Sequence, residues 1–566
     1  MDAELVRDYR FGAFRLETAK RRLSGPDGTV PLAGRAYDVL AYLILHRNRV
    51  VGKDELLKAV WPHTVVEENN LNQAVSALRR ALCDSRDAPS FIVTVAGRGY
   101  QFIGETAPAQ PPKSIAILPF KPLLPDARNP ALEFGVTELL VNRLSRLPGL
   151  VVAPLSSVMP FAAPDANPID AGRRLKVEAV VDARLYVHED RVRVTARLLD
   201  VGGGTTLWAN DFTEPLGNLL AVQDTLAMEL VNALAPHLSD EARSGVLDPQ
   251  TRDVEAWQLY ANGQYNFERR DAAGIRRAIS FFDAARERDP HFALASASLA
   301  DACTLTTVFG IEPPKAAFDK ALPAATRAIE LDRRLPAGYA ALGHIETQYH
   351  RDLAAGRKNY LHALELNPRY GWAFALLALN FCQAGQLANA ADSIAKAQEV
   401  EPASLAYIAV SGFIRYFARA YVDAERALLR VVDTAPQAPL PRQFLARVWL
   451  AQRQGARVAR MLDGHNDPAP GAYSNLGRAL AQVGDERGAR AEIERLEALA
   501  PQGYGVGFDL ALLHLELGER ERALDALERG VGDLSQMEAY LNVEPALDAL
   551  RAEPRFRSVS GRLRLG

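Results

Sequence analysis

The sequence VVEENNLNQAVSALRRAL (residues 65–82) is followed after a short loop by IVTVAGRGYQF (residues 92–102). The first segment predicts an amphipathic helix, because its apolar residues recur at the helical period and form one stripe. That stripe consists of Leu71, Val75, Leu78 and Leu82. The second segment predicts two short strands, 91–95 and 100–103, joined by a turn that carries Arg98. A helix with a polar face beside an arginine-tipped hairpin is typical of DNA-binding domains.

The polar side of the predicted helix carries amides, a hydroxyl and guanidinium groups. Such groups recognise base edges and hold phosphates in a DNA major groove. An ordinary solvated helix face also carries arginines, and it is the adjacent hairpin that favours DNA binding. The candidates on this side are Asn69, Asn72, Gln73, Ser76, Arg79 and Arg80.

The residues before the helix add a strand over 9–16, a turn at 25–28, and two further helices over 36–46 and 53–61. In this order, the segment resembles the winged helix-turn-helix of the OmpR/PhoB-type transcription regulators. The resemblance is carried by the motifs VVGKDELLKAVWP, VEENNLNQAVSALRRAL and TVAGRGYQF.

This resemblance implies that the helix over 69–82 enters the major groove and that the hairpin, or wing, touches the adjacent backbone or minor groove. By position, Asn69, Ser76 and Arg79 are expected at phosphates. Ala77 stands where some relatives carry a base-contacting arginine, so their base preference does not transfer to this chain. Thr94 and Arg98 are expected on the wing.

Charge is unevenly distributed along the 566 residues, whose formal net charge is −3. Residues 1–104 hold 15 lysines and arginines against 12 acidic residues, whereas the remainder is net acidic. The modest excess predicts that affinity for double-stranded DNA depends on a local basic patch. We also expect a homodimer, which would pair two half-sites.

The cysteines Cys83, Cys303 and Cys382 are far apart and match no metal or redox spacing, and the ten histidines form no metal set. We therefore expect no metal, no cofactor and a reduced, cytoplasmic protein. No run of about 20 apolar residues is present, so no membrane span is expected. Residues 105–113 (ETAPAQPPK) predict an extended, Pro-rich linker.

Residues 114–240 alternate strands and helices and then form a meander, which predicts a small three-layer α/β domain. This part resembles the TolB amino-terminal-like domain through SIAILPF, FGVTELLVNRLSRLPGLVV and RVRVTARLLDVGGGTTLWANDF. The resemblance says little about chemistry, and the sequence contains no nucleophile elbow, Walker loop or zincin motif.

Residues 250–566 are repetitive. Pro368, Pro402 and Pro436 are each 34 residues apart, which is the period of tetratricopeptide repeats. We expect six to eight helix pairs, irregular over 439–470, with small residues such as Gly477 where paired helices approach closely. Such repeats stack into a solenoid, whose concave groove would bind a protein or peptide.

The sequence thus predicts a multidomain α+β and all-α protein: a winged helix (1–104), a linker (105–113), a three-layer α/β domain (114–240) and an α-helical tetratricopeptide solenoid (250–566). We expect a sequence-specific DNA-binding transcription regulator, not an enzyme, whose carboxy-terminal domains sense or assemble a partner. The alternatives are an interaction scaffold with a winged helix that does not recognise DNA, and an enzyme in the α/β domain.

Overall fold

The computed structural model describes residues 9–563 except 18–20, 27, 48, 63–65, 67, 105–106, 109–111, 123–129, 146, 148, 164, 189–190, 235–249, 403, 437 and 464–466. The chain forms two compact units. One comprises 1–127, 140–153 and 158–247, and the other comprises 128–139, 154–157 and 248–566. The domain boundaries expected from the sequence stay predictions, as does the resemblance of 114–240 to the TolB-like domain.

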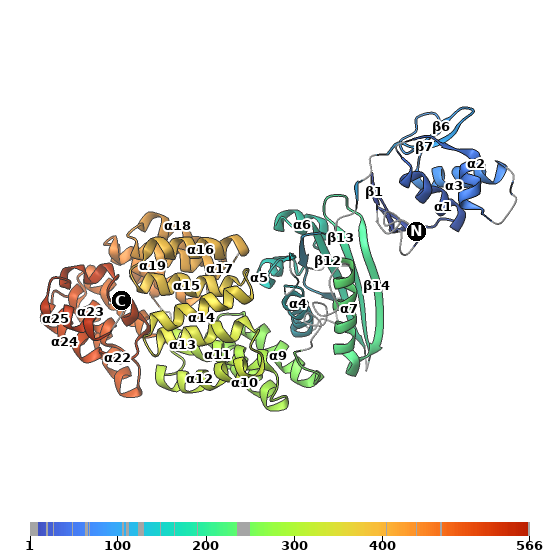
Figure 1. Cartoon of the computed structure of the whole chain (residues 1–566). Coiled ribbons are helices and arrows are strands. Elements are labelled where there is room, and N and C mark those ends of the chain that lie inside the picture. The colour runs from blue at the N-terminus through green and yellow to red at the C-terminus, as the bar shows by residue number, and fades with distance from the viewer. Residues whose placement is uncertain are drawn as a thin grey trace. The chain divides into compact units, whose positions relative to one another are not determined.

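The amino-terminal part has a β-sheet, three helices and a small second sheet (Figure 1). The first sheet contains β1 (Tyr9–Phe11), β2 (Phe14–Glu17), β3 (Arg22–Gly25), β4 (Gly28–Val30) and β8 (Ala107–Pro108), in the order β4-β3-β2-β1-β8. The helices are α1 (Gly34–Leu45), α2 (Lys53–Val60) and α3 (Glu68–Leu82). The second sheet has the order β5 (Val51–Gly52), β7 (Gly99–Phe102), β6 (Ile92–Val95).

Two features of this part differ from the expectations. The strand predicted over 9–16 is a hairpin, because Gly12 turns the chain with φ 54°, a conformation that favours glycine. Within the linker, Ala107 and Pro108 pair with β1, so part of the Pro-rich segment is held by the sheet. The predicted winged helix is otherwise confirmed, and the apolar stripe of α3 is buried.

The α/β part contains a six-stranded sheet with the order β11-β9-β12-β13-β14, and β10 also pairs with β12. Its strands are β9 (Ser114–Ile117), β10 (Lys121–Pro122), β11 (Val151–Val152), β12 (Ala179–His188), β13 (Arg191–Asp200) and β14 (Thr206–Pro215). Its helices are α4 (Pro130–Leu144), α5 (Leu155–Val158), η3 (Met159–Phe161), α6 (Pro168–Leu175), η4 (Leu216–Asn218) and α7 (Leu219–Leu234).

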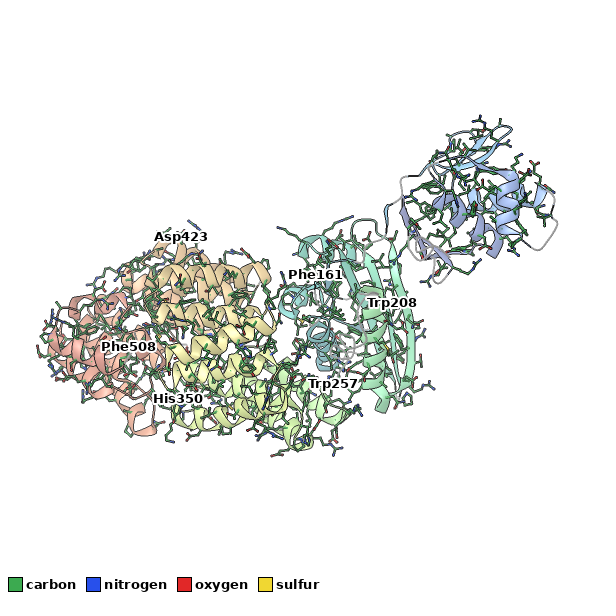
Figure 2. The ribbon with its side chains drawn as sticks, viewed as in Figure 1. Phe161, Trp208, Trp257, His350, Asp423 and Phe508 are labelled. Atoms are coloured by element: carbon green, nitrogen blue, oxygen red, sulfur yellow. The ribbon has the colours of Figure 1, made fainter. Side chains whose placement is uncertain are left out.

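Helices lie on both faces of this sheet. A Cβ added to Gly172 of α6 would approach Val180 within 2.6 Å, so α6 covers the face to which Val180 points. The next residue, Val181, points to the opposite face and aligns across β13 with Trp208. The Trp208 indole donates a hydrogen bond to Glu229 of α7 at 3.0 Å (Figure 2). The predicted three-layer arrangement is confirmed.

The carboxy-terminal half is a stack of antiparallel helix pairs (Figure 1). Over the described residues the pairs number eight: α9 (Val254–Phe267) and α10 (Ala272–Arg288), α11 (Ala293–Val308) and α12 (Pro314–Leu331), α13 (Pro336–Gln348) and α14 (Leu353–Leu366), α15 (Gly371–Gln383) and α16 (Leu387–Val400), α17 (Leu405–Phe417) and α18 (Tyr421–Thr434), α19 (Pro439–Ala451) and α20 (Gly455–Leu462), α21 (Pro470–Gln482) and α22 (Glu486–Leu499), and α23 (Gly507–Glu516) and α24 (Arg520–Gly530). The tetratricopeptide-type solenoid is confirmed, and its irregular pair contains the eight-residue helix α20.

The solenoid curves strongly. The first helix of each pair packs against the first helix of the next from α11 to α23, so the first helices line the inner surface. The hydroxyl of Tyr504, which precedes α23, donates to the carbonyl of Gly310 at the end of α11, at 3.1 Å. The segment between the seventh and eighth pairs therefore touches the second pair.

Residues 535–544, after the last helix pair, lie on this inner surface. After η5 (Ala500–Gln502) and α24 come η6 (Gln536–Tyr540), η7 (Pro545–Leu550) and α25 (Pro554–Arg562). The η6 segment contacts both α15 and α23. The Tyr540 ring stacks on Phe417 with centroids 4.9 Å apart, and the buried Glu544 accepts hydrogen bonds from Tyr416 and from Arg447, the latter at 3.2 Å. The predicted peptide groove is therefore filled here by the chain's own residues.

Glu538 supplies a test of this packing. Its carboxyl is 4% exposed and pairs with Arg351 at 3.2 Å; burial raises its pKa to about 7, although Arg351 lowers it. Because the folded-state pKa exceeds the unfolded one, this group's stabilising contribution is lost as the pH rises through about 7. We expect Glu538→Gln to change the free energy of unfolding more favourably at pH 8 than at pH 5, by about 1–3 kcal/mol, because at pH 8 the wild type carries a buried charge that glutamine removes.

Chemical denaturation at the two pH values measures this difference, with the exposed Glu494→Gln as the control variant. Equal effects of Glu538→Gln at both pH values would contradict the burial argument.

Candidate nucleic-acid interface

One side of α3 is free of the core. Its apolar side, including Leu71, Val75 and Leu78, packs against the helices and strands of the amino-terminal core. The opposite side carries side chains that are exposed or, for Ala77 and Arg79, half-buried. All seven candidates on α3 are exposed or half-buried, and the half-buried Ala77 packs at the edge of the core: Asn69, Asn72, Gln73, Ser76, Ala77, Arg79 and Arg80.

Arg79 connects α3 to the wing. Its Nη2 donates to the carbonyl oxygen of Ile92 at 3.0 Å and to Oγ1 of Thr94 at 2.9 Å, both on β6. The sequence pattern placed Arg79 and Thr94 on separate surfaces and did not indicate this contact. Arg79 thus positions the wing relative to α3, besides any contact that it makes outside the chain.

Asn72 is also linked to the wing. Its Oδ1 accepts a hydrogen bond from the hydroxyl of Tyr100 on β7 at 2.7 Å, although the residue is exposed. Recognition of adenine by an amide needs both the amide oxygen and the amide nitrogen. Since the oxygen of Asn72 is engaged, Gln73, which is exposed and makes no such contact in the described residues, is the better placed amide for a bidentate base contact.

The wing turn presents Arg98 to solvent. The turn needs glycine on both sides, because Gly97 has φ 70° and Gly99 has φ 151°. A Cβ at Gly99 would lie 2.0 Å from the carbonyl oxygen of Val51, so only glycine allows β7 to pair with β5. The Gly-x-Gly sequence thereby fixes where Arg98 leaves the sheet.

Asp84 holds the connection between α3 and β6, a role that the sequence pattern did not indicate. Its carboxylate accepts from three backbone N–H groups: Ser90 at 2.6 Å, Phe91 at 3.2 Å and Ile92 at 2.8 Å. The residue is 7% exposed. The sequence signal for this role is the position of an aspartate just after the helix and before a loop, where a carboxylate commonly accepts hydrogen bonds from backbone N–H groups.

No residue here forms a metal site: among the described residues, no three or more histidine, cysteine, aspartate or glutamate side chains are placed to share a metal ion. Likewise, none of the described helices is both long and apolar enough to cross a membrane.

Removing the Asp84 carboxylate should loosen the wing. In Asp84→Ala, three backbone N–H groups lose their charged acceptor, and we expect a cost of at least about 2 kcal/mol. Hydrogen exchange of the full-length chain should then speed up over residues 84–102 and stay unchanged over α9–α24. The exposed Asp87→Ala is the matched control. Unchanged exchange in Asp84→Ala would show that this carboxylate does not hold the wing.

Comparison with known proteins identifies this domain. Residues 27–102 match the family described as "Transcriptional regulatory protein, C terminal". The putative adenylate cyclase 3 of Rhizobium meliloti is 30% identical over 244 residues, which are 42% of this chain and 40% of that protein. The transcriptional regulator HilA of Salmonella paratyphi A is 23% identical over 418 residues, 70% of this chain and 71% of HilA.

Among solved structures, the DNA-binding domain of Escherichia coli CadC is 27% identical and covers 18% of this chain and 97% of that structure, with a TM-score of 0.17. This chain spans well under two thirds of the cyclase relative and slightly more than two thirds of HilA. The family match covers α1 to β7, which are the elements that carry the exposed face of α3 and the wing. Residues 27–102 therefore form an OmpR/PhoB-type DNA-binding domain of the kind found in transcriptional regulatory proteins.

Proposed function

We propose that this protein binds specific double-stranded DNA sites as a homodimer, with α3 in the major groove and the wing on the adjacent backbone or minor groove. The observation that supports this most directly is the exposed polar side of α3, beside the exposed Arg98 of the wing. Amide and guanidinium groups there are the donors and acceptors that base edges and phosphates require.

We assign two kinds of contact to the nine candidate residues. Base contacts fall to Gln73 and, through its amide nitrogen, Asn72, while Ala77 supplies at most an apolar contact to a thymine methyl. Phosphate contacts fall to the remaining residues of α3 and to the wing: Asn69, Ser76, Arg79, Arg80, Thr94 and Arg98. Arg79 has the additional role of holding Thr94.

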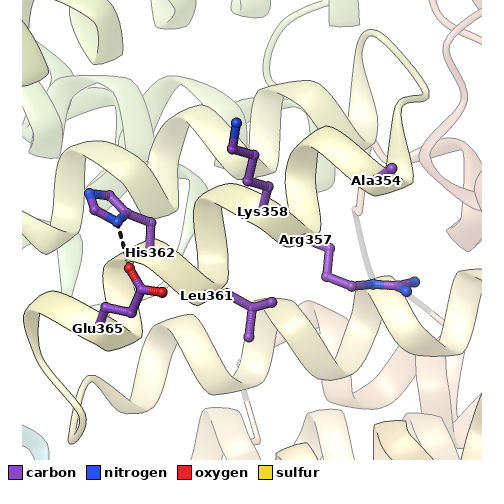
Figure 3. A pocket seen from close by; sticks show the side chains of 6 residues that line it. All are labelled: Ala354, Arg357, Lys358, Leu361, His362 and Glu365. Atoms are coloured by element: carbon purple, nitrogen blue, oxygen red, sulfur yellow. Dashed lines mark hydrogen bonds and ion pairs between the residues drawn. The ribbon is translucent and has the colours of Figure 1, made fainter.

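The rest of the chain would connect DNA binding to a protein partner in the cytoplasm. Since residues 535–544 fill the inner surface of the solenoid, we propose that the partner binds its outer helices. An open hollow of 440 Å³ along α14 is one such place (Figure 3). It exposes Leu361, which is 46% exposed, beside Lys358 and the ion pair of His362 with Glu365 at 2.9 Å.

We do not assign an enzymatic reaction to the chain, and the cyclase relative's name describes that protein alone. The competing function is a scaffold whose winged helix does not recognise DNA. Its support is the low net charge of residues 1–104 and the alanine at position 77. The two functions differ in whether the exposed side of α3 determines a sequence preference.

Substitutions on α3 and the wing should separate the two kinds of contact. Arg80→Ala and Arg98→Ala remove one phosphate contact each, so each should weaken binding to all sequences and reduce the slope of log K against log salt by about one. Gln73→Ala should instead weaken binding to the preferred site by about 1–3 kcal/mol and leave binding to other sequences unchanged. Fluorescence anisotropy across a salt series measures both effects.

The matched control is Arg86→Ala, an exposed arginine in the loop after α3. If Gln73→Ala and Arg80→Ala altered affinity and salt dependence in the same way, the division into base and phosphate contacts would be wrong.

A second prediction concerns the coupling between the two halves. We propose that the contacts that hold two copies together lie in residues 114–566. We therefore expect a fragment of residues 1–113 to keep the sequence preference but to bind a paired site more weakly than the full chain. Circular dichroism establishes that the fragment is folded, and titration of one-site and two-site DNA gives the comparison. Identical affinities of fragment and full chain for the paired site would rule out this coupling.

A further inference from the structure

One face of the α/β sheet carries a row of exposed arginines. Residues at every second position of β13 point to the same side, and on this side β13 carries Arg191, Arg193 and Arg197, all exposed. Arg184 of β12 is also exposed and aligns with Thr195, which lies between Arg193 and Arg197 on that side. We call the surface formed by Arg184, Arg191, Arg193 and Arg197 the arginine face.

The opposite side of the same strands explains why this face is accessible. There β13 places Val192, Val194, Ala196 and Leu198, all fully buried. Helix α6 lies on the arginine side but covers the far end of the sheet, at Val180. The arginines therefore belong to the uncovered part of a sheet that is packed on its other side.

The arginine face is positively charged, although the α/β part as a whole is net acidic. Residues 114–240 contain 11 lysines and arginines and 15 acidic residues. Among the described residues of β12, β13 and β14, the carboxylates on the arginine side are Asp182 and Asp211. Asp182 is buried and shared between Arg197 at 2.7 Å and Lys121 at 3.5 Å.

The remaining pairing is weak. Arg193 approaches Asp211 at 3.4 Å, and both side chains are about half exposed. Such an exposed pair contributes little and is readily exchanged for another anion. In the described part of the chain, Arg184 forms no ion pair. Cations thus outnumber anions on this face, and at least Arg184 is available to an external ligand.

We propose that the arginine face binds the phosphate backbone of the DNA that flanks the site held by α3. This inference rests on the proposed DNA-binding function. Guanidinium groups match phosphate oxygens with two parallel hydrogen bonds, and the neutral Thr195 hydroxyl between them is a further phosphate donor. Arginines two positions apart on a strand are separated by about 6.6 Å, and neighbouring strands by about 4.8 Å, so the face presents an array of charges instead of one site.

The length of the linker limits how far from the recognised site the arginine face can contact the DNA. Because Ala107 and Pro108 pair with β1, the five residues 109–113 connect the amino-terminal sheet to β9, and a chain of that length spans at most about 18 Å. One turn of DNA is about 34 Å. The arginine face would therefore reach phosphates within roughly one helical turn of the recognised site, on the same DNA molecule.

The experiment compares the full-length chain with the variant Arg184→Gln/Arg193→Gln/Arg197→Gln. Each binds the selected site on a short duplex, with no flanking turns, and on a long duplex, with two flanking turns on each side, across a salt series. The control variant removes three exposed arginines of the solenoid, Arg426→Gln/Arg430→Gln/Arg487→Gln. A third variant replaces the same three face residues by lysine, which keeps the charge.

The wild-type chain should bind the long duplex more tightly and with a salt slope larger by about two to three than on the short duplex. The glutamine variant of the face should lose this difference on the long duplex and bind the short duplex as the wild type does. The lysine variant and the solenoid control should keep most of the difference. Lower thermal stability of the glutamine variant together with weaker binding to both duplexes would assign Arg197 a structural role through Asp182 and would overturn the inference.

The inference is overturned if the face variant and the solenoid control behave alike on the long duplex. It is also overturned if the face variant keeps the length effect of the wild type. Failure of the wild-type chain to bind even the short duplex would instead refute the proposed function.

Discussion

The hydrogen bonds of Arg79 to Ile92 and Thr94 join the helix that carries the candidate base contacts to the wing that carries Arg98. Asp84 holds the loop between these elements, and Asn72 and Tyr100 connect α3 to β7. Together these contacts fix the orientation of the wing relative to α3. The exposed surfaces of both can therefore contact a rigid duplex at the same time. The side chains of Arg79 and Asn72, which would be free in an isolated helix, hold the wing in place.

Much of this fold could be predicted because it depends on local periodicity. The stripe from Leu71 to Leu82 gives α3, the 34-residue spacing of prolines gives the helix pairs, and alternation gives β13. The hairpin at Gly12 was not predictable from alternation, since one residue of positive φ reverses the chain without interrupting the pattern. The DNA contacts of the exposed residues on α3 and the wing stay predictions, because only their exposure supports them.

The features that sequence reasoning missed involve contacts between distant residues. Nothing in the pattern around Arg79 shows that its partner lies 15 residues later on β6. Likewise, the composition of residues 535–544 does not indicate that Tyr540 stacks on Phe417 or that Glu544 meets Arg447 inside the solenoid. Removing one partner of such a buried ion pair leaves an uncompensated buried charge and is strongly destabilising. The segment therefore behaves as part of the solenoid core. This packing is why we propose the outer helices as the surface for a partner.

The proposed function depends on recognition of particular DNA sequences by the exposed side of α3. The decisive measurement is a selection of the full-length chain against a pool of random duplexes at two salt concentrations. We expect enrichment of a direct or inverted repeat, with binding that weakens steeply as salt rises. Binding without any enriched sequence, or no binding at low salt by either the full chain or residues 1–104, would contradict it.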